Sequence, residues 1–252
     1  MNWYKIVIAY DGTDFHGWQV QPSDETVMSV LEKTFTTAFS RSISLVGASR
    51  TDAGVHALGQ VALCGTDLSI SPDQIMYVWN NALPKSIVIR SIEQAPQDFH
   101  IFAHVSSKTY YYHLFYERPL PFIARYGWFW KFIESVDFEK FRNAMDCFVG
   151  EHDFRSFCKH ENGQKTVRTI DSIAIEKYER FGAVRATIKS SGFLRYQIRR
   201  MVGAALDVAR KRELPVDAIS HHLKHPNDQQ EFTRAAGCGL CLRKIIYGKG
   251  GK

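Results

Sequence analysis

One segment gathers several residue types that can do chemistry. It runs from Gly47 to Ala57 and reads Gly-Ala-Ser-Arg-Thr-Asp-Ala-Gly-Val-His-Ala. It lies between an apolar stretch and a predicted strand, so we expect a loop whose glycines allow tight turns and a close approach to a ligand. Arg50 stands two residues before Asp52, where it can pair with that carboxylate or bind a phosphate. A carboxylate kept ionised by an arginine can act as a nucleophile or a base, although the same residues also fit an ordinary Asp-Ala-Gly turn with a structural ion pair.

Arginines are concentrated in a second segment, from Gly192 to Gly203, which reads Gly-Phe-Leu-Arg-Tyr-Gln-Ile-Arg-Arg-Met-Val-Gly. Its apolar residues recur at helical spacing, and we predict a helix over roughly 195–210. Arg195 and Arg199 are four residues apart and would share one face of that helix, with Arg200 beside them. Guanidinium groups near a helix N-terminus favour phosphate binding; a solvated basic face is the alternative.

Three consecutive tyrosines occupy a predicted strand over 108–115. Alternation along a strand places Tyr110 and Tyr112 on one face and Tyr111 on the other. Exposed aromatic rings beside basic groups stack on nucleic-acid bases, whereas tyrosines of a sheet core satisfy their hydroxyl groups internally. One carboxylate, several arginines and stackable tyrosines together are what a site acting on a nucleotide requires.

Five cysteines are present, at positions 64, 147, 158, 238 and 241. An odd count in a chain without a secretory signal argues against a disulfide framework. Cys238 and Cys241 have the CxxC spacing of zinc and redox sites, but no second such pair completes a four-cysteine site. We therefore favour the interpretation that Cys238 and Cys241 are two small apolar residues at the start of a C-terminal strand.

Composition narrows the class of protein. The chain has 252 residues, a net charge of +6 and 45% hydrophobic residues, which excludes a disordered, collagen-like or coiled-coil chain. A basic balance is compatible with nucleic acid or an anionic membrane as partner. No apolar run is long enough to cross a membrane, and the N-terminus has no signal-peptide pattern, so we expect a cytoplasmic protein. There is no P-loop, no GxGxxG after a strand, no HExxH and no nucleophile elbow, so ATP hydrolysis, nicotinamide chemistry and zinc proteolysis have no support.

Periodicity and turn signals predict an α+β protein of two sheet-and-helix halves with mainly antiparallel sheets. The predicted strands are 3–10, 57–64, 87–94, 108–115, 167–178, 183–190 and 240–247, and the predicted helices are 26–41, 71–82, 138–148, 195–210 and 216–223.

Taken in chain order, several motifs resemble the TruA family of tRNA pseudouridine synthases. The stretch Tyr10-Asp-Gly-Thr-Asp-Phe-His-Gly-Trp-Gln19 is similar to the N-terminal signature of that family, and Ser49-Arg-Thr-Asp-Ala-Gly-Val-His-Ala57 is similar to its catalytic loop. Matches also occur at 107–110, 150–154, 192–203 and 239–242, so the resemblance covers nearly the whole chain. Ser49, Met28-Ser29 and Tyr196-Gln197 depart from the usual residues of the family, which leaves the reaction type unaffected but puts fine RNA contacts in question.

The resemblance implies a pseudouridine synthase fold of two similar halves with the active-site cleft between them. By position, Asp52 would be the catalytic residue, and Tyr110 would stack on the target uracil. Arg50 and Arg199 would be basic, substrate-binding residues near the aspartate. The implied reaction is the isomerisation of uridine to pseudouridine at positions 38, 39 and 40 in the anticodon stem-loop of tRNAs.

The resemblance also implies a cytoplasmic homodimer that has tRNA as its partner and needs no cofactor, metal or membrane. The halves are expected at 1–104, which carries the aspartate loop, and at 105–252, which carries the tyrosine strand and the arginine helix. A wider basic surface would bind the phosphates of the RNA. It would include Arg195, Arg200, Arg210, Lys211 and Arg212.

Three rival functions are weighed against this interpretation. An RNA-binding protein without catalysis would not need Asp52. A nucleoside or base hydrolase would use Asp52 against C1′ and release free uracil. Zinc or redox chemistry would use Cys238 and Cys241.

Overall fold

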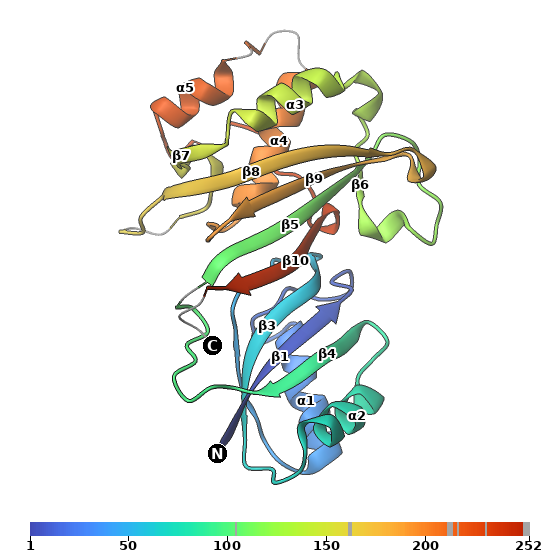
Figure 1. The fold of residues 1–252 in the computed structure, drawn as a ribbon. Helices are drawn as coiled ribbons and strands as arrows, with labels where there is room; N and C mark the ends of the chain where they lie inside the picture. Colours follow the sequence, from blue (N-terminus) through green and yellow to red (C-terminus); the bar gives the residue numbers. More distant parts are fainter. Residues whose placement is uncertain (104, 161–162, 211–213, 216, 230, 249–252) are drawn as a thin grey trace. The chain divides into compact units, whose positions relative to one another are not determined.

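The computed structural model describes residues 1–252 except 104, 161–162, 211–213, 216, 230 and 249–252 (Figure 1). The chain divides into two compact units, Met1–Ser106 with Cys241–Lys252, and Ser107–Leu240. The division differs from the predicted halves, 1–104 and 105–252, at the last strand. That strand pairs in parallel with a strand of the first unit, through Cys241 opposite His56 and Leu242 opposite Ala57.

A mainly antiparallel sheet forms the first unit. Its strands are β1 (Asn2–Tyr10), β2 (Ser44–Gly47), β3 (His56–Thr66), β4 (Ile87–Gln94) and β10 (Leu240–Tyr247). The order is β4-β1-β3-β10, and β2 also pairs with β3. β1 covers one edge of β3 from Ala57 to Thr66, so β2 and β10 divide the other edge between them, β2 near Gly65 and β10 near His56.

Two helices lie on one face of this sheet, α1 (Val27–Phe39) and α2 (Pro72–Ala82) (Figure 1). Each begins at a capping box, with Thr26 and Ser71 as the N-cap residues, which satisfies N–H groups that have no partner inside the helix. Phe35 and Trp79 are fully buried, and their rings meet edge to face with centroids 4.9 Å apart. Capping thus defines the start of each helix, and the contact of Phe35 with Trp79 packs the two helices against each other.

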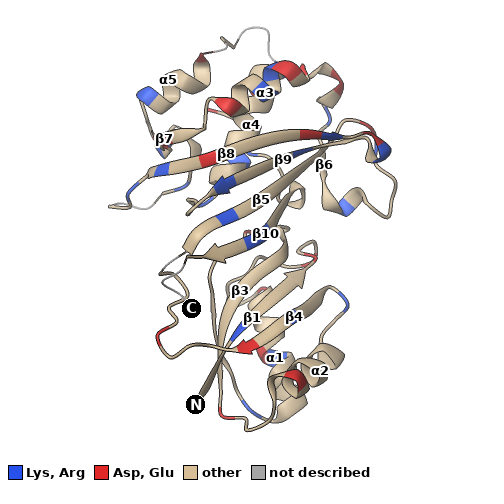
Figure 2. Cartoon of the chain, viewed as in Figure 1, with Lys and Arg blue, Asp and Glu red and all other residues tan. Residues whose placement is uncertain are grey.

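The second unit also contains mainly antiparallel sheet. Its strands are β5 (Val105–Phe115), β6 (Trp128–Phe129), β7 (Gly150–Asp153), β8 (Val167–Tyr178) and β9 (Ala183–Ser190), in the order β5-β9-β8-β7 with β6 parallel to the end of β5. Lys and Arg lie on β5, β8 and β9 (Figure 2). The fold class predicted from the sequence, α+β with mainly antiparallel sheets, is therefore confirmed.

Three helices cover one face of this sheet: α3 (Phe138–Asp146), α4 (Gln197–Arg210) and α5 (Ala218–Lys224) (Figure 1). α4 is the central one and is buried along most of its length. It begins two residues later than predicted, because Tyr196 has a left-handed backbone conformation with φ +65° that an α-helix does not accommodate. None of the helices in the described part of the chain combines the length and the apolar character needed to cross a membrane.

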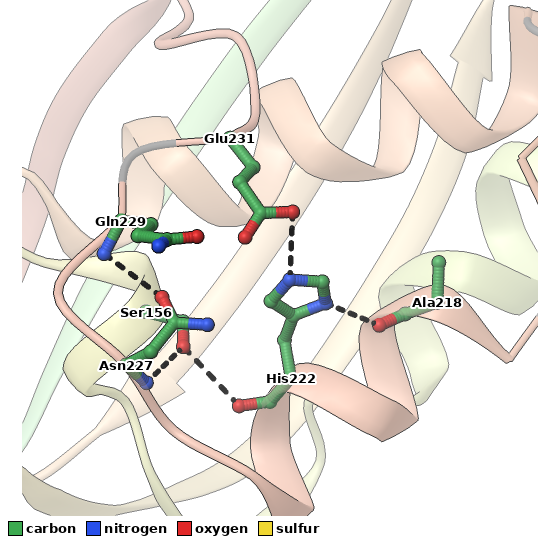
Figure 3. A network of polar contacts seen from close by, with 6 residues as sticks. All are labelled: Ser156, Ala218, His222, Asn227, Gln229 and Glu231. Carbon is green, nitrogen blue, oxygen red and sulfur yellow. Dashed lines mark hydrogen bonds and ion pairs between the residues drawn. The ribbon is translucent and has the colours of Figure 1, made fainter.

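A polar network ties α5 to the 3₁₀ helix η3 (Arg155–Phe157) (Figure 3). The buried Ser156 hydroxyl accepts a hydrogen bond from the Asn227 N–H (2.9 Å) and donates to the His222 carbonyl (3.3 Å). The His222 ring lies 2.8 Å from the Ala218 carbonyl oxygen through Nδ1 and 3.1 Å from Glu231 Oε2 through Nε2. These contacts fix the C-terminal end of α5 and the turn that follows it.

Another segment of backbone packs closely against α4 at Gly203. A Cβ added there would overlap the carbonyl oxygen of Thr233, which is backbone and cannot rotate away. We therefore expect Gly203→Ala to lower the free energy of unfolding by roughly 2 kcal/mol, since overpacking outweighs the ~1 kcal/mol gain in helix propensity. Urea denaturation followed by circular dichroism measures the change. Gly192→Ala is the matched control, because its added Cβ would have no atom within 4 Å. Equal midpoints for the two variants would contradict the expectation.

Candidate active site

The segment from Gly47 to Ala57 carries Asp52, and we call it the aspartate loop. It is hydrogen-bonded to the segment that follows β1. The Trp18 N–H donates to the Thr51 carbonyl (3.1 Å), and the Gly54 N–H donates to the Phe15 carbonyl (3.2 Å). Asp52 lies between these two attachment points and is half-buried. Its position is therefore set by backbone hydrogen bonds on both sides of it.

Glycines make this close approach possible. A Cβ on Gly12 would overlap the Val55 carbonyl, and one on Gly17 would lie 2.7 Å from the Thr51 carbonyl oxygen. Gly17 also has φ +96°, a conformation that favours glycine. The motif from Tyr10 to Gln19, matched in the sequence only by resemblance, thus has a physical role as the platform for the aspartate loop.

Two side-chain contacts complete the attachment. The hydroxyl groups of Tyr10 and Thr51 are 2.8 Å apart in a buried hydrogen bond. His56 is 6% exposed, and its Nδ1 lies 3.1 Å from the Gly12 N and 3.2 Å from Asp11 Oδ1. Sequence reasoning did not assign Tyr10, Asp11 and His56 to the site, although all three stand inside the matched motifs.

Arg50 differs from Asp52 in its exposure to solvent. It is exposed and forms no ion pair with any other described residue. The structural ion pair with Asp52 that was considered from the spacing is therefore absent from the described part of the chain. Of the two roles weighed for Arg50, contact with a phosphate is the one that its exposure favours.

On β5, the tyrosines alternate as predicted. Tyr110 is 5% exposed and meets the ring of Phe193 edge to face at 5.3 Å. Tyr112 is 1% exposed, and its hydroxyl donates to the Ala236 carbonyl (3.0 Å), while burial raises the pKa of Tyr112. Tyr111 lies on the other face, where the Arg185 guanidinium is 4.3 Å from its ring centroid. Tyr112 is thus the core tyrosine with a satisfied hydroxyl group.

Arg199 lies in the first turn of α4. Its Nε donates to the Ala235 carbonyl (2.8 Å), and the Ala235 N–H donates to the Arg199 carbonyl (3.0 Å). Arg195 precedes the helix, so the prediction that Arg195 and Arg199 share a helical face is wrong. The two guanidinium groups nevertheless both lie over the ring of Tyr196, at 5.0 and 5.4 Å from its centroid. Lys211 and Arg212, also expected on the basic surface, lie outside the described residues.

The four predicted site residues are divided between the units. Asp52 and Arg50 belong to the first unit, and Tyr110 and Arg199 belong to the second.

The CxxC cysteines have the character of structural residues. Burial raises the pKa of Cys241, in β10, to about 12, and it also raises the pKa of Cys238. A protonated thiol is a poor metal ligand and a poor nucleophile. Within the residues that the structure describes, no group of three or more His, Cys, Asp or Glu side chains is arranged to hold a metal ion.

Lys108 stands two residues before Tyr110 on the same face of β5, and burial lowers its pKa from 10.5 to about 8. The unfolded chain therefore binds more protons than the folded protein between these two pH values, and stability rises with pH across this window.

Lys108→Met removes this titration. The variant should be more stable than the native protein at neutral pH by up to roughly 3 kcal/mol, at about 1.4 kcal/mol per pKa unit. The difference should shrink as the pH rises from 8 towards 10.5. Urea unfolding of both proteins at several pH values measures it, and a difference that does not vary with pH would show the expectation to be wrong.

Comparison with known proteins supports one family. A family model described as "tRNA pseudouridine synthase" matches residues 6–102 and 144–248. Proteins named tRNA pseudouridine synthase A are similar over nearly their full length. The one from Thermodesulfovibrio yellowstonii is 32% identical over 96% of this chain and 98% of its own. The one from Mesoplasma florum is 35% identical over 97% and 98%, and the one from Streptococcus equi is 36% identical over 98% and 99%.

Among solved structures, a chain in a crystal structure of a Cbf5-Nop10-Gar1 complex aligns with a TM-score of 0.34 and 12% identity, over 81% of this chain and 45% of that one. A TM-score of 0.34 is too low to show a shared fold. The family model and the full-length relatives show that the chain belongs to the tRNA pseudouridine synthase family, whose members are isomerases that act on uridine in tRNA.

Proposed function

We propose that this protein converts uridine to pseudouridine at positions 38, 39 and 40 in the anticodon stem-loop of tRNAs, with Asp52 as the catalytic residue. Membership of the family supports the reaction. The observation that carries the assignment of Asp52 is its place at the centre of a loop that is hydrogen-bonded to the first-unit platform on both sides. A half-buried carboxylate with a fixed backbone is preorganised to meet a reacting atom.

The reaction requires one acidic side chain and a bound uracil base. The bond between C1′ and N1 breaks, the uracil turns, and C1′ is joined to C5. Asp52 can attack C1′, attack the uracil ring, or remove the 2′ proton to give a glycal. In each case the detached uracil must stay bound until it has turned, which favours a closed site from which water is excluded.

The target uridine must leave the base stack before a carboxylate can reach it. Flipping costs a few kcal/mol, and stacking on Tyr110 would return about 1–3 kcal/mol of this. Arg199 would orient Asp52 or the nucleotide through its planar guanidinium, which forms paired hydrogen bonds better than lysine does. Arg50, exposed and without a carboxylate partner among the described residues, would contact a phosphate.

A cytoplasmic homodimer without a cofactor belongs to the same proposal. These properties are implied by the resemblance of the motifs to the TruA family. The net charge of +6 supports the polyanionic partner, tRNA.

Asp52→Asn should abolish pseudouridine formation while tRNA binding stays within about tenfold, a change of ~1.4 kcal/mol. The substitution keeps the shape of the side chain but removes the group that attacks or accepts a proton. Carbodiimide treatment followed by primer extension on anticodon-arm RNA detects the product, and filter binding measures affinity.

Asp67→Asn is the matched control, because Asp67 is an exposed carboxylate of the same unit and, among the described residues, pairs with Arg41 alone, at 3.7 Å. Normal conversion by Asp52→Asn would refute the role of Asp52. Chromatography of the native reaction tests the hydrolase alternative, which requires free uracil to be released.

Arg199→Ala should lower the rate of a single turnover more than it lowers affinity for tRNA, because Arg199 acts through the aspartate or the reacting nucleotide. Rapid-quench measurements at saturating enzyme separate the two quantities. Equal losses of rate and affinity would instead make Arg199 a plain phosphate contact.

A further inference from the structure

The segment 233–235 crosses one face of α4, and we call it the strap. It meets the helix at Asp207, Gly203 and Arg199, which are spaced four residues apart and therefore share that face. The first residue of the strap bonds to the Asp207 carboxylate, the carbonyl of the same residue lies against Gly203, and the last residue bonds to Arg199. The strap thus runs antiparallel to the helix and connects a buried carboxylate with an arginine of the candidate site.

Asp207 holds its end of the strap at two points. The Thr233 N–H donates to Asp207 Oδ2 (2.8 Å), and the Thr233 hydroxyl donates to Asp207 Oδ1 (3.0 Å). Asp207 is only 2% exposed, and a buried carboxylate is costly unless it accepts hydrogen bonds. Two hydrogen bonds from one residue to one carboxylate fix the register of the strap along the helix as well as its attachment.

The other end of the strap fixes the Arg199 side chain. Arg199 Nε donates to the Ala235 carbonyl (2.8 Å), and the Ala235 N–H donates to the Arg199 carbonyl (3.0 Å). The Arg199 guanidinium also lies over the ring of Tyr196, 5.4 Å from its centroid. Because a guanidinium group is planar, a hydrogen bond at Nε and a ring beneath its face set the direction in which its two terminal nitrogens point. That direction therefore depends on where Ala235 lies.

The place of Ala235 depends in turn on Asp207. One residue separates Thr233 from Ala235, and peptide groups are rigid, so a shift of the first residue moves the second. Stability alone does not require a charged group at position 207, because two apolar partners of the same shape can replace a buried hydrogen bond at almost no cost. What the carboxylate adds is a fixed register between the strap and α4.

We propose that Asp207 is a positioning residue for the reaction, and that through the strap it holds the Arg199 guanidinium in the orientation that the chemical step needs. The proposal rests on the proposed function, in which Arg199 orients Asp52 or the reacting nucleotide. Asp207 lies beneath the strap and acts through Arg199. Orientation matters to the rate, because a misplacement of about 1 Å can cost on the order of a hundredfold.

The first test compares two substitutions of Asp207. Asp207→Ala removes both acceptors, whereas Asp207→Asn keeps both contacts, since its amide oxygen accepts from the Thr233 N–H and its amide nitrogen donates to the hydroxyl. The alanine variant should lower the single-turnover rate about ten- to a hundredfold and keep Kd for anticodon-arm RNA within about threefold. The asparagine variant should keep both quantities within about threefold of the native values. Rapid-quench and filter-binding measurements give them, and equal rates in the two variants, low or native, would overturn the proposal.

Substitutions of Thr233 test the same link should the alanine variant fail to fold. Thr233→Val keeps the shape of the side chain and loses only the hydroxyl, so it should lower the single-turnover rate about three- to tenfold, whereas Thr233→Ser should match the native protein. Glu231→Ala is the matched control, because Glu231 holds the chain just before the strap through His222, at 3.1 Å, and not through α4 (Figure 3). The control should lower the urea midpoint and leave the rate unchanged. A loss of rate in the control as large as in Thr233→Val would overturn the proposal.

A double-mutant cycle shows whether Asp207 acts through Arg199. In the Arg199→Ala background, Asp207→Ala should lower the single-turnover rate by less than about twofold, because the side chain that it positions is gone. Losses that multiply in the double variant would overturn the proposal, since Asp207 would then act by another route.

Hydrogen exchange at Arg199 tests the positioning without catalysis. The Arg199 Nε–H gives an NMR signal that is identified by its absence from Arg199→Lys, and its bond to the Ala235 carbonyl should slow its exchange with solvent. Asp207→Ala should raise the exchange rate about tenfold, and Asp207→Asn should leave it at the native value. Native exchange in Asp207→Ala would overturn the positioning role. Failure of the native protein to form pseudouridine would contradict the proposed function instead, and the exchange rates would still decide whether Asp207 positions Arg199.

Discussion

The aspartate loop depends on a backbone approach that only glycine permits. Gly12 lies against the Val55 carbonyl and Gly17 against the Thr51 carbonyl, so two loops that are far apart in sequence are held together mainly through peptide groups. Peptide hydrogen bonds have little rotational freedom, and they fix the backbone on both sides of Asp52. A larger residue at position 12 would force the loops apart, and the carboxylate would lose its defined position.

In the second unit, too, a glycine allows two backbone segments to approach closely. Gly203 lets the chain around Thr233 lie directly on α4, and the buried Asp207 holds it there. This contact places the Ala235 carbonyl where it accepts a hydrogen bond from Arg199, and it places the Arg234 guanidinium over the ring of Tyr196. The backbone that carries Arg234 is therefore held on α4 by a glycine contact and a buried carboxylate.

Most of the fold is readable from local pattern. Ser71-Pro72-Asp73-Gln74 predicted the start of α2, and the alternation of β8 and β9 predicted both strands with the bounds that the structure has. The short strands β2, β6 and β7 were not predicted, because two to four residues are too few to establish a period. The start of α4 was placed two residues early, because hydrophobic spacing does not reveal that Tyr196 is left-handed.

The sequence alone determined the family and the candidate chemistry, because Arg-Thr-Asp-Ala-Gly-Val-His is a contiguous motif and needs no fold to be read. It also placed Tyr110 and Tyr112 on one face of a strand, since that alternation is a local property. Only the tertiary structure decided that Tyr112 is a core residue and that Arg50 forms no ion pair with a carboxylate among the described residues. It also decided that Arg234 joins Arg195 and Arg199 over one ring. These outcomes depend on contacts between segments many residues apart, such as Arg199 with Ala235, which no local pattern encodes.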